Sequence, residues 1–125
     1  MIKQISKITI YVSDQHKAKQ FWLDQMDFQI IVEQPMGPTM TWLEVAPNKA
    51  SSTSFVLYEK EWMKQQNPEN PLTHPSLILS TDDIQTTYNT LKERGVDIKE
   101  LMDMPYGKMF TFYDPDHNAY LIREH

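Results

Sequence analysis

Residues 7–14 read Lys-Ile-Thr-Ile-Tyr-Val-Ser-Asp, and residues 76–83 read Ser-Leu-Ile-Leu-Ser-Thr-Asp-Asp. When the two stretches are aligned, the first two isoleucines coincide with the two leucines. Each stretch alternates like a β-strand and then reaches Asp, a residue type that often caps a helix. With the same offset, Trp22 in the first half falls on Leu91 in the second. The two halves are therefore predicted to be a diverged internal repeat.

The first half continues as an amphipathic helix followed by strands. A helix is expected over 16–26, because apolar residues recur there at three- and four-residue spacing, namely Ala18, Phe21, Trp22 and Met26. Strands are expected over 8–12, 28–33, 39–45 and 53–58, with proline-containing turns between the last three. The order is β-α-β-β-β.

The second half repeats this order after a polar connector. Residues 59–73 contain Pro68 and Pro71, and we expect a loop there with one helical turn around Trp62 and Met63. A strand over 76–81 should lead to a helix capped by Asp82. The inner face of that helix should consist of Ile84, Tyr88 and Leu91, and Gly95 should end the helix. Three more strands are expected over 96–101, 108–114 and 119–124.

The repeat predicts an α+β fold of one domain over residues 1–125. Module one covers 1–58, the connector 59–73 and module two 74–125. In each module one helix covers one face of a short sheet, and the other face stays open until a second module completes it. A shared concave surface is therefore expected.

The composition excludes several classes of function. The net charge of −5 argues against nucleic-acid binding, and the absence of cysteine excludes thiolate chemistry and cysteine-bound zinc. The three glycines cannot build a phosphate-binding loop. No apolar run approaches the roughly eighteen residues of a membrane span, and the first fourteen residues do not look like a signal peptide, so we expect a cytoplasmic protein with no membrane partner.

The ordered motifs of the two halves carry a family resemblance. Residues 8–14, together with the helix after them, resemble the opening of the vicinal oxygen chelate fold. The second half resembles that family's second module at residues 81–84, Tyr88, Leu91, 95–96, 105–107 and 114–118. The superfamily comprises glyoxalases, bleomycin-resistance proteins and extradiol dioxygenases. The resemblance implies paired β-α-β-β-β modules that form a curled mixed sheet around a cup, built within one chain or across a dimer. His117 stands where the family usually has glycine, and the turn is expected to survive because histidine tolerates positive φ better than β-branched residues do.

The same resemblance implies that the family's metal site is missing. Metal-dependent members place His, Gln or Glu on four cup-facing strands and leave positions open for vicinal substrate oxygens. The aligned positions here are Lys7, Val56, Ser76 and Leu121. None of these is a competent divalent ligand, so no metal and no cofactor are expected. A nonstandard site built from His74 and Glu44 stays open as an alternative, and the remaining histidines are expected to be solvated: His16, His117 and His125.

Strand alternation predicts the lining of the cup. With Ile8, Ile10 and Val12 facing the helix, the residues between them face the cup. The candidate ligand-binding residues are Lys7, Tyr11, Trp42, Glu44, Tyr58, Ser76, Met109, Tyr113 and Leu121. The competing interpretation is that the aromatic and methionine side chains only fill a core, and that Lys7 is a solvated lysine at the rim.

Two functions follow as hypotheses. The first is a metal-free homodimer that binds a small organic molecule, as the bleomycin-resistance members do, with a cationic ligand favoured by the net charge. The second is a metal-dependent lyase, isomerase or dioxygenase of the glyoxalase type that uses His74 and Glu44. The identity of the ligand, and whether any reaction is catalysed, are left open by the sequence.

Overall fold

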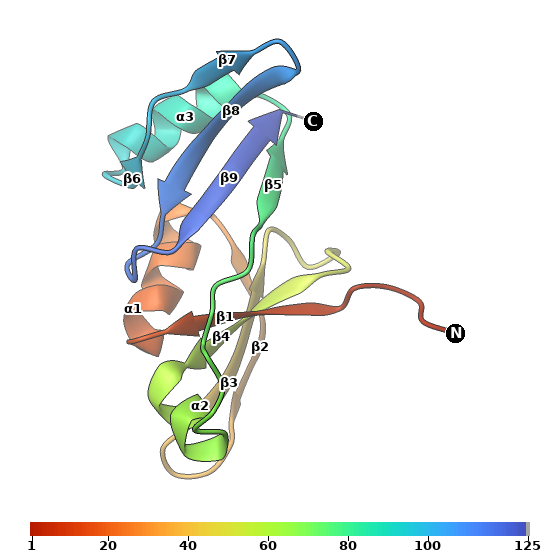
Figure 1. The fold of residues 1–125 in the computed structure, drawn as a ribbon, viewed down its shortest axis with the longest axis vertical. Helices are drawn as coiled ribbons and strands as arrows, with labels where there is room; N and C mark the ends of the chain where they lie inside the picture. Colours follow the sequence, from red (N-terminus) through yellow and green to blue (C-terminus); the bar gives the residue numbers. More distant parts are fainter. Residues whose placement is uncertain (125) are drawn as a thin grey trace. The chain divides into compact units, whose positions relative to one another are not determined.

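The computed structural model describes residues 1–124, so His125 lies outside the described residues. The chain forms two compact units, Met1–His74 and Pro75–His125. Each unit contains one mixed sheet and one helix that follows the unit's first strand, as Figure 1 shows. The expected α+β class and the doubled β-α-β-β-β order are thus observed. No helix in this part of the chain is long and apolar enough to cross a membrane.

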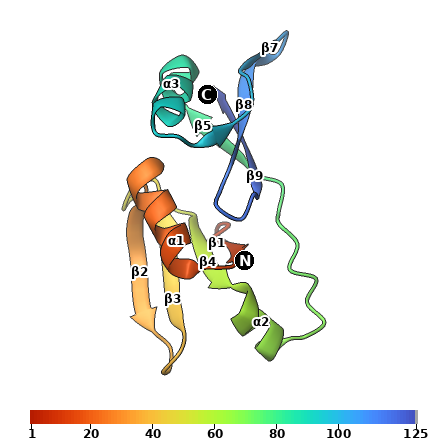
Figure 2. The ribbon, with the colours of Figure 1, turned by 90° about the vertical axis from the view of Figure 1, so that its left-hand side faces the viewer.

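Unit one has a four-stranded sheet. The strands in spatial order are β1 (Lys7–Val12), β4 (Ser54–Glu59), β3 (Thr41–Ala46) and β2 (Gln29–Pro35). β1 and β4 are parallel, and the other neighbours are antiparallel. Helix α1 (Gln15–Gln20) lies along one face of this sheet, as Figure 2 shows.

The core of unit one lies under this helix. Ile10 and Val12 from β1 and Trp22 from the helix are at most 1% exposed. The Trp22 ring lies edge-on to Phe55 of β4, with centroids 5.2 Å apart. Removing these large apolar side chains from water is the main force that seats the helix on the sheet. The predicted helix over 16–26 begins at Gln15 and ends in a π-helical turn, η1 (Phe21–Gln25).

The connector between the units is more ordered than expected. Instead of one turn, it contains helix α2 (Lys60–Gln66) directly after β4. Trp62 and Met63 on this helix pack against the sheet face that α1 does not cover. Partial burial of this apolar pair explains why a stretch with a polar composition becomes helical.

Unit two has a five-stranded sheet. Its elements are β5 (Ile78–Thr81), α3 (Ile84–Glu93), β6 (Asp97–Ile98), β7 (Met102–Met104), β8 (Gly107–Tyr113) and β9 (Ala119–Glu124). The spatial order is β5-β9-β8-β6, and β7 also pairs with β8. Phe110 and Phe112 of β8 are fully buried, and Phe110 contacts Tyr88 of α3 edge-on.

Three details of unit two correct the sequence analysis. The single strand expected over 96–101 is two short strands, β6 and β7. Ile98 pairs with Phe112 and Met102 pairs with Met109, so the chain advances by four positions on this side and by three on β8. The extra residue forms a bulge that divides the strand. The first strand begins at Ile78, not at residue 76. The helix cap is Asp83 and not Asp82, since the Asp83 carboxylate accepts the Thr86 N–H at 3.1 Å.

The register of the sheets confirms the internal repeat. Thr9 is opposite Val56 in unit one, and Ile78 is opposite Leu121 in unit two. The sequence alignment of the halves makes Thr9 and Ile78 equivalent, and the family resemblance sets Val56 and Leu121 at corresponding positions on the last strand of each module. The two modules therefore share the pairing of their first and last strands as well as the order of their elements.

The turn after β8 is organised by one buried carboxylate. Asp114 accepts the backbone N–H groups of Asp116 and Asn118, each at 2.9 Å, and the Tyr120 hydroxyl at 2.8 Å. His117 adopts φ 63°, and its ring stacks on Tyr113 with centroids 4.4 Å apart. The turn thus keeps the left-handed residue that was expected at this position.

Candidate functional site

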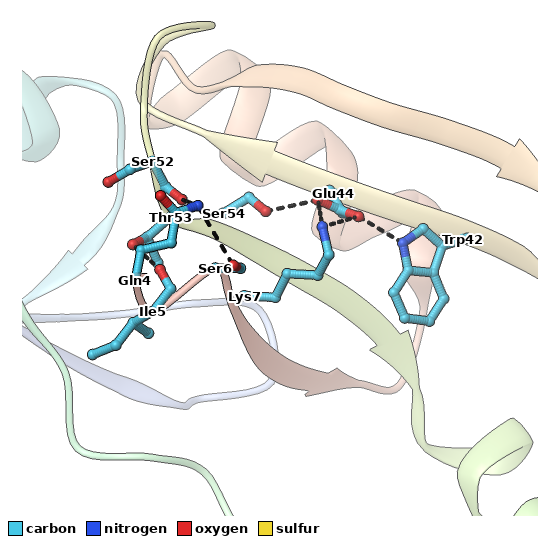
Figure 3. A network of polar contacts seen from close by, with 9 residues as sticks. All are labelled: Gln4, Ile5, Ser6, Lys7, Trp42, Glu44, Ser52, Thr53 and Ser54. Atoms are coloured by element: carbon cyan, nitrogen blue, oxygen red, sulfur yellow. Dashed lines mark hydrogen bonds and ion pairs between the residues drawn. The ribbon is translucent and has the colours of Figure 1, made fainter. Parts of the chain in front are cut away.

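A buried carboxylate on unit one is the most organised polar feature of its sheet. Glu44 of β3 is 3% exposed and lies on the face opposite α1. The Lys7 ammonium donates to Glu44 Oε1 at 2.7 Å and to Oε2 at 2.8 Å. Trp42 Nε1–H donates to Oε2 and Ser54 Oγ–H donates to Oε1, both at 2.7 Å. Figure 3 shows this set, which we call the Glu44 network, converging from three strands.

The strand register brings these residues together. Lys7 on β1 is paired with Ser54 on β4, and Glu44 on β3 is paired with Val56, two residues along the same face of β4. Trp42 precedes Glu44 by two residues and therefore shares its face. The chain segments that precede Lys7 and Ser54 are also hydrogen-bonded to each other, because Gln4 Nε2 donates to the carbonyl of Ser52 at 3.3 Å.

The network keeps Glu44 ionised. Burial alone would raise the pKa of this carboxyl, but hydrogen bonds from Lys7, Trp42 and Ser54, together with the lysine charge, hold its pKa below the usual value. A carboxylate offers about four lone-pair positions, and all four are used here. Glu44 therefore has no accepting capacity left while the network is intact.

Next to this network lies an apolar group that we call the aromatic cluster. Its members are Met40, Val56 and Tyr58, with Tyr11, Trp42, Trp62 and Met63 packed against them. Tyr58 is the central ring, with centroids 6.0 Å from Tyr11, 6.2 Å from Trp42 and 4.7 Å from Trp62. Burial and the neighbouring Tyr11 raise the pKa of Tyr58, so its hydroxyl stays neutral. Trp42 belongs to both groups and links them.

The five candidate residues of unit one lie in these two adjoining groups. They are Lys7, Tyr11, Trp42, Glu44 and Tyr58. Lys7 is half-exposed, as a rim lysine would be, but its ammonium is paired with Glu44. Tyr11 is held in place from the connector, because its hydroxyl accepts the Asn70 side-chain N–H at 3.2 Å.

The four candidates of unit two are less concentrated. Ser76 is exposed and precedes β5. Met109 is buried, while Tyr113 and Leu121 are half-buried on β8 and β9. Their role in ligand binding stays a prediction.

Ser54 and Trp62 are among the contributors that sequence reasoning did not name as candidates. Ser54 could have been identified from strand alternation, since it lies two residues before Val56 on the same face. Trp62 was assigned to a connector, although it lies four residues after Tyr58, with which its ring packs. This pair of aromatic residues four positions apart was the sequence signal that could have identified Trp62.

The residues present do not fit the metal of the metal-dependent family members. Within residues 1–124, no three His, Cys, Asp or Glu side chains are grouped so that they could hold a metal ion. Glu44, the carboxylate proposed for a nonstandard site, is saturated, and the Lys7 ammonium 2.7 Å away would repel a cation. His74, its proposed companion, is half-buried at the end of unit one.

Comparisons with known proteins agree with this description. Protein YetH of Bacillus subtilis (strain 168) is 41% identical over 99% of this chain and 100% of its own length. Metallothiol transferase FosB of Staphylococcus haemolyticus (strain JCSC1435) is 27% identical over 100% of this chain and 84% of its own. The crystal structure of TnmS3, an antibiotic binding protein from Streptomyces sp. CB03234, superposes with a TM-score of 0.80 at 33% identity, covering 98% of this chain and 96% of TnmS3. The sequence profile of the Glyoxalase/Bleomycin resistance protein/Dioxygenase superfamily matches residues 4–121, and the chain belongs to that superfamily.

Proposed function

We propose that this protein binds a small organic molecule, without a metal ion, on the face of unit one formed by the aromatic cluster and the Glu44 network. The observation that carries the proposal is the closed Lys7–Glu44 ion pair beside partly exposed aromatic rings. Sites for organic ligands commonly combine an apolar lining with a few fixed polar groups. Both components are present on this face.

The relatives support binding rather than a particular ligand. TnmS3, at 33% identity over nearly the whole chain, is described as antibiotic binding. A comparable role here would use Tyr11, Trp42 and Trp62, which are half-buried and therefore keep surface for a ligand. Large aromatic rings supply much contact area at a small cost in side-chain entropy.

An enzymatic role has a weaker basis. FosB is named a metallothiol transferase, but a similar chemistry here would need metal ligands in place of Lys7, Val56, Ser76 and Leu121. Recruiting Glu44 would require breaking its bonds to Lys7, Trp42 and Ser54 at once. We therefore do not include turnover in the proposal.

The preference for a cationic ligand depends on the net charge alone. The charge of −5 attracts cations at long range, but the one buried carboxylate of this face is already neutralised by Lys7. The homodimer and the cytoplasmic location expected from the sequence stay predictions, and analytical ultracentrifugation and cell fractionation test them.

Ligand titrations followed by tryptophan emission test the proposed function, because Trp42 and Trp62 belong to the aromatic cluster. Saturable quenching by planar organic compounds is expected, unchanged by a chelator. Trp62→Ala should weaken binding about tenfold, while Tyr106→Ala, which removes an aromatic ring that is 63% exposed in unit two, should not. Binding that requires stoichiometric metal, or no saturable binding across a chemically broad library, would refute the proposal.

A further inference from the structure

The Lys7 ammonium is only partly committed to Glu44. An ammonium has three N–H donors, and two of them bond the two oxygens of this carboxylate. The lysine side chain is 49% exposed, whereas Glu44 is almost fully buried. In this ion pair the accepting carboxylate is therefore buried, whereas the donating lysine side chain is accessible.

The third donor lies close to an indole of fixed position. Lys7 Nζ and Trp42 Nε1 both bond Glu44 Oε2, at 2.8 and 2.7 Å, so the two nitrogens are no more than 5.5 Å apart, the sum of the two bonds. The bond to Glu44 fixes the orientation of the Trp42 ring, which is half-buried in the aromatic cluster. A planar ligand resting on that ring can place a ring substituent next to Lys7.

The charges select the kind of substituent. A cationic group would meet the positive ammonium and a carboxylate without a free lone pair, so it gains nothing at this position. An anionic group gains little more than a neutral one, because the lysine charge is already offset by Glu44. A neutral carbonyl oxygen needs a single donor and brings no charge that must be neutralised. The network has one N–H donor left and a lysine charge that is already neutralised, so the two match.

We infer that Lys7 donates its third Nζ–H to a carbonyl oxygen of the ligand, so that this face selects neutral, planar aromatic carbonyl compounds. The inference rests on the proposed function and adds the chemical class of the ligand and the residue that recognises it. Glu44 acts as a positioning residue in this arrangement, since it orients both Lys7 and Trp42 without touching the ligand.

Fluorenone and fluorene provide a matched pair of probes that differ in one carbonyl oxygen, and proflavine provides a planar cation. Wild-type protein should bind fluorenone about tenfold more tightly than fluorene, the size expected for one added hydrogen bond from a charged donor. Lys7→Met/Glu44→Gln removes the donor without leaving a buried charge, and it should reduce the ratio of fluorenone to fluorene affinity, measured within the variant, to about one. The matched control, Lys19→Met/Glu33→Gln, removes another pair at 2.7 Å and should leave the ratio as it is in the wild type.

A second measurement needs no variant. Fluorenone labelled with carbon-13 at the carbonyl should show a downfield carbonyl resonance when bound, because its oxygen accepts a hydrogen bond. Equal affinities for fluorenone and fluorene with an unshifted resonance, or tighter binding of proflavine, would overturn the inference and leave the proposed function standing. If none of the three compounds binds while other organic compounds do, the inference fails alone; if nothing binds at all, both fail.

Discussion

The Glu44 network makes an asymmetric prediction about stability. Lys7→Met leaves the Glu44 carboxylate buried with only Trp42 and Ser54 as donors, whereas Glu44→Gln leaves an ammonium that is already half in water. Removing one partner of a fully buried pair costs about 3–5 kcal/mol, and the exposure of Lys7 reduces this. We expect a loss of about 2.5 kcal/mol for Lys7→Met and about 1 kcal/mol for Glu44→Gln.

The double variant should cost less than the sum of the single ones. Lys7→Met/Glu44→Gln leaves no buried charge, so we expect a loss of about 2 kcal/mol and a coupling energy of about 1.5 kcal/mol. The exposed Lys19–Glu33 pair serves as the control and should show a coupling of about 0.5 kcal/mol or less.

Urea unfolding followed by tryptophan emission measures these stability losses and coupling energies in unit one, which contains the Glu44 network. All three tryptophans lie in unit one, at positions 22, 42 and 62, so their emission reports on the unit that contains the Glu44 network. Additive single costs, or a Glu44→Gln variant less stable than Lys7→Met, would show that the carboxylate is not held by the ammonium and would refute the reasoning.

Three further predictions concern the turn, the helix cap and pH. His117→Gly should stabilise the protein by about 0.5 kcal/mol, measured by thermal unfolding, because glycine adopts the positive φ of this turn without strain and the gain exceeds the lost ring stacking; a destabilised variant would contradict this. Asp83→Ala should cost about 1 kcal/mol and Asp82→Ala less than about 0.5 kcal/mol, and equal costs would refute the assignment of the cap. The stability that ionised Glu44 contributes should be complete above the unfolded-state pKa near 4.5 and be lost as the pH falls through its lower folded pKa. Unfolding midpoints in acid should therefore fall less steeply for Glu44→Gln than for the wild type.

The sequence was sufficient for the repeat but not for its finer details. Alternation in residues 8–12 and the helical spacing of Ala18 and Trp22 are local properties, and the burial of Ile10, Val12 and Trp22 follows them. The bulge between Ile98 and Met102 depends on how a distant strand pairs, which local pattern does not encode.

The candidate site shows the same division. Parity placed Trp42 and Glu44 on one face of their strand, yet it could not show that Lys7 on another strand meets them, because contact across strands depends on register. That register is set by turns far from the site. The alignment of the halves could have corrected the helix cap, since it sets Asp83, and not Asp82, opposite Asp14, which caps the first helix.

The family resemblance sets Lys7 at the position of a metal ligand, and this difference concerns more than the charge of the site. A divalent ion with open coordination positions can take two vicinal oxygens of a substrate and polarise both. An ammonium tied to Glu44 by two of its donors has one donor left, so it can address a single oxygen. The chemistry that depends on chelating two oxygens is therefore not open to this face, while recognition of one oxygen on an aromatic ligand is. Under the proposed function, this difference favours the recognition of one ligand oxygen over the chelation of two.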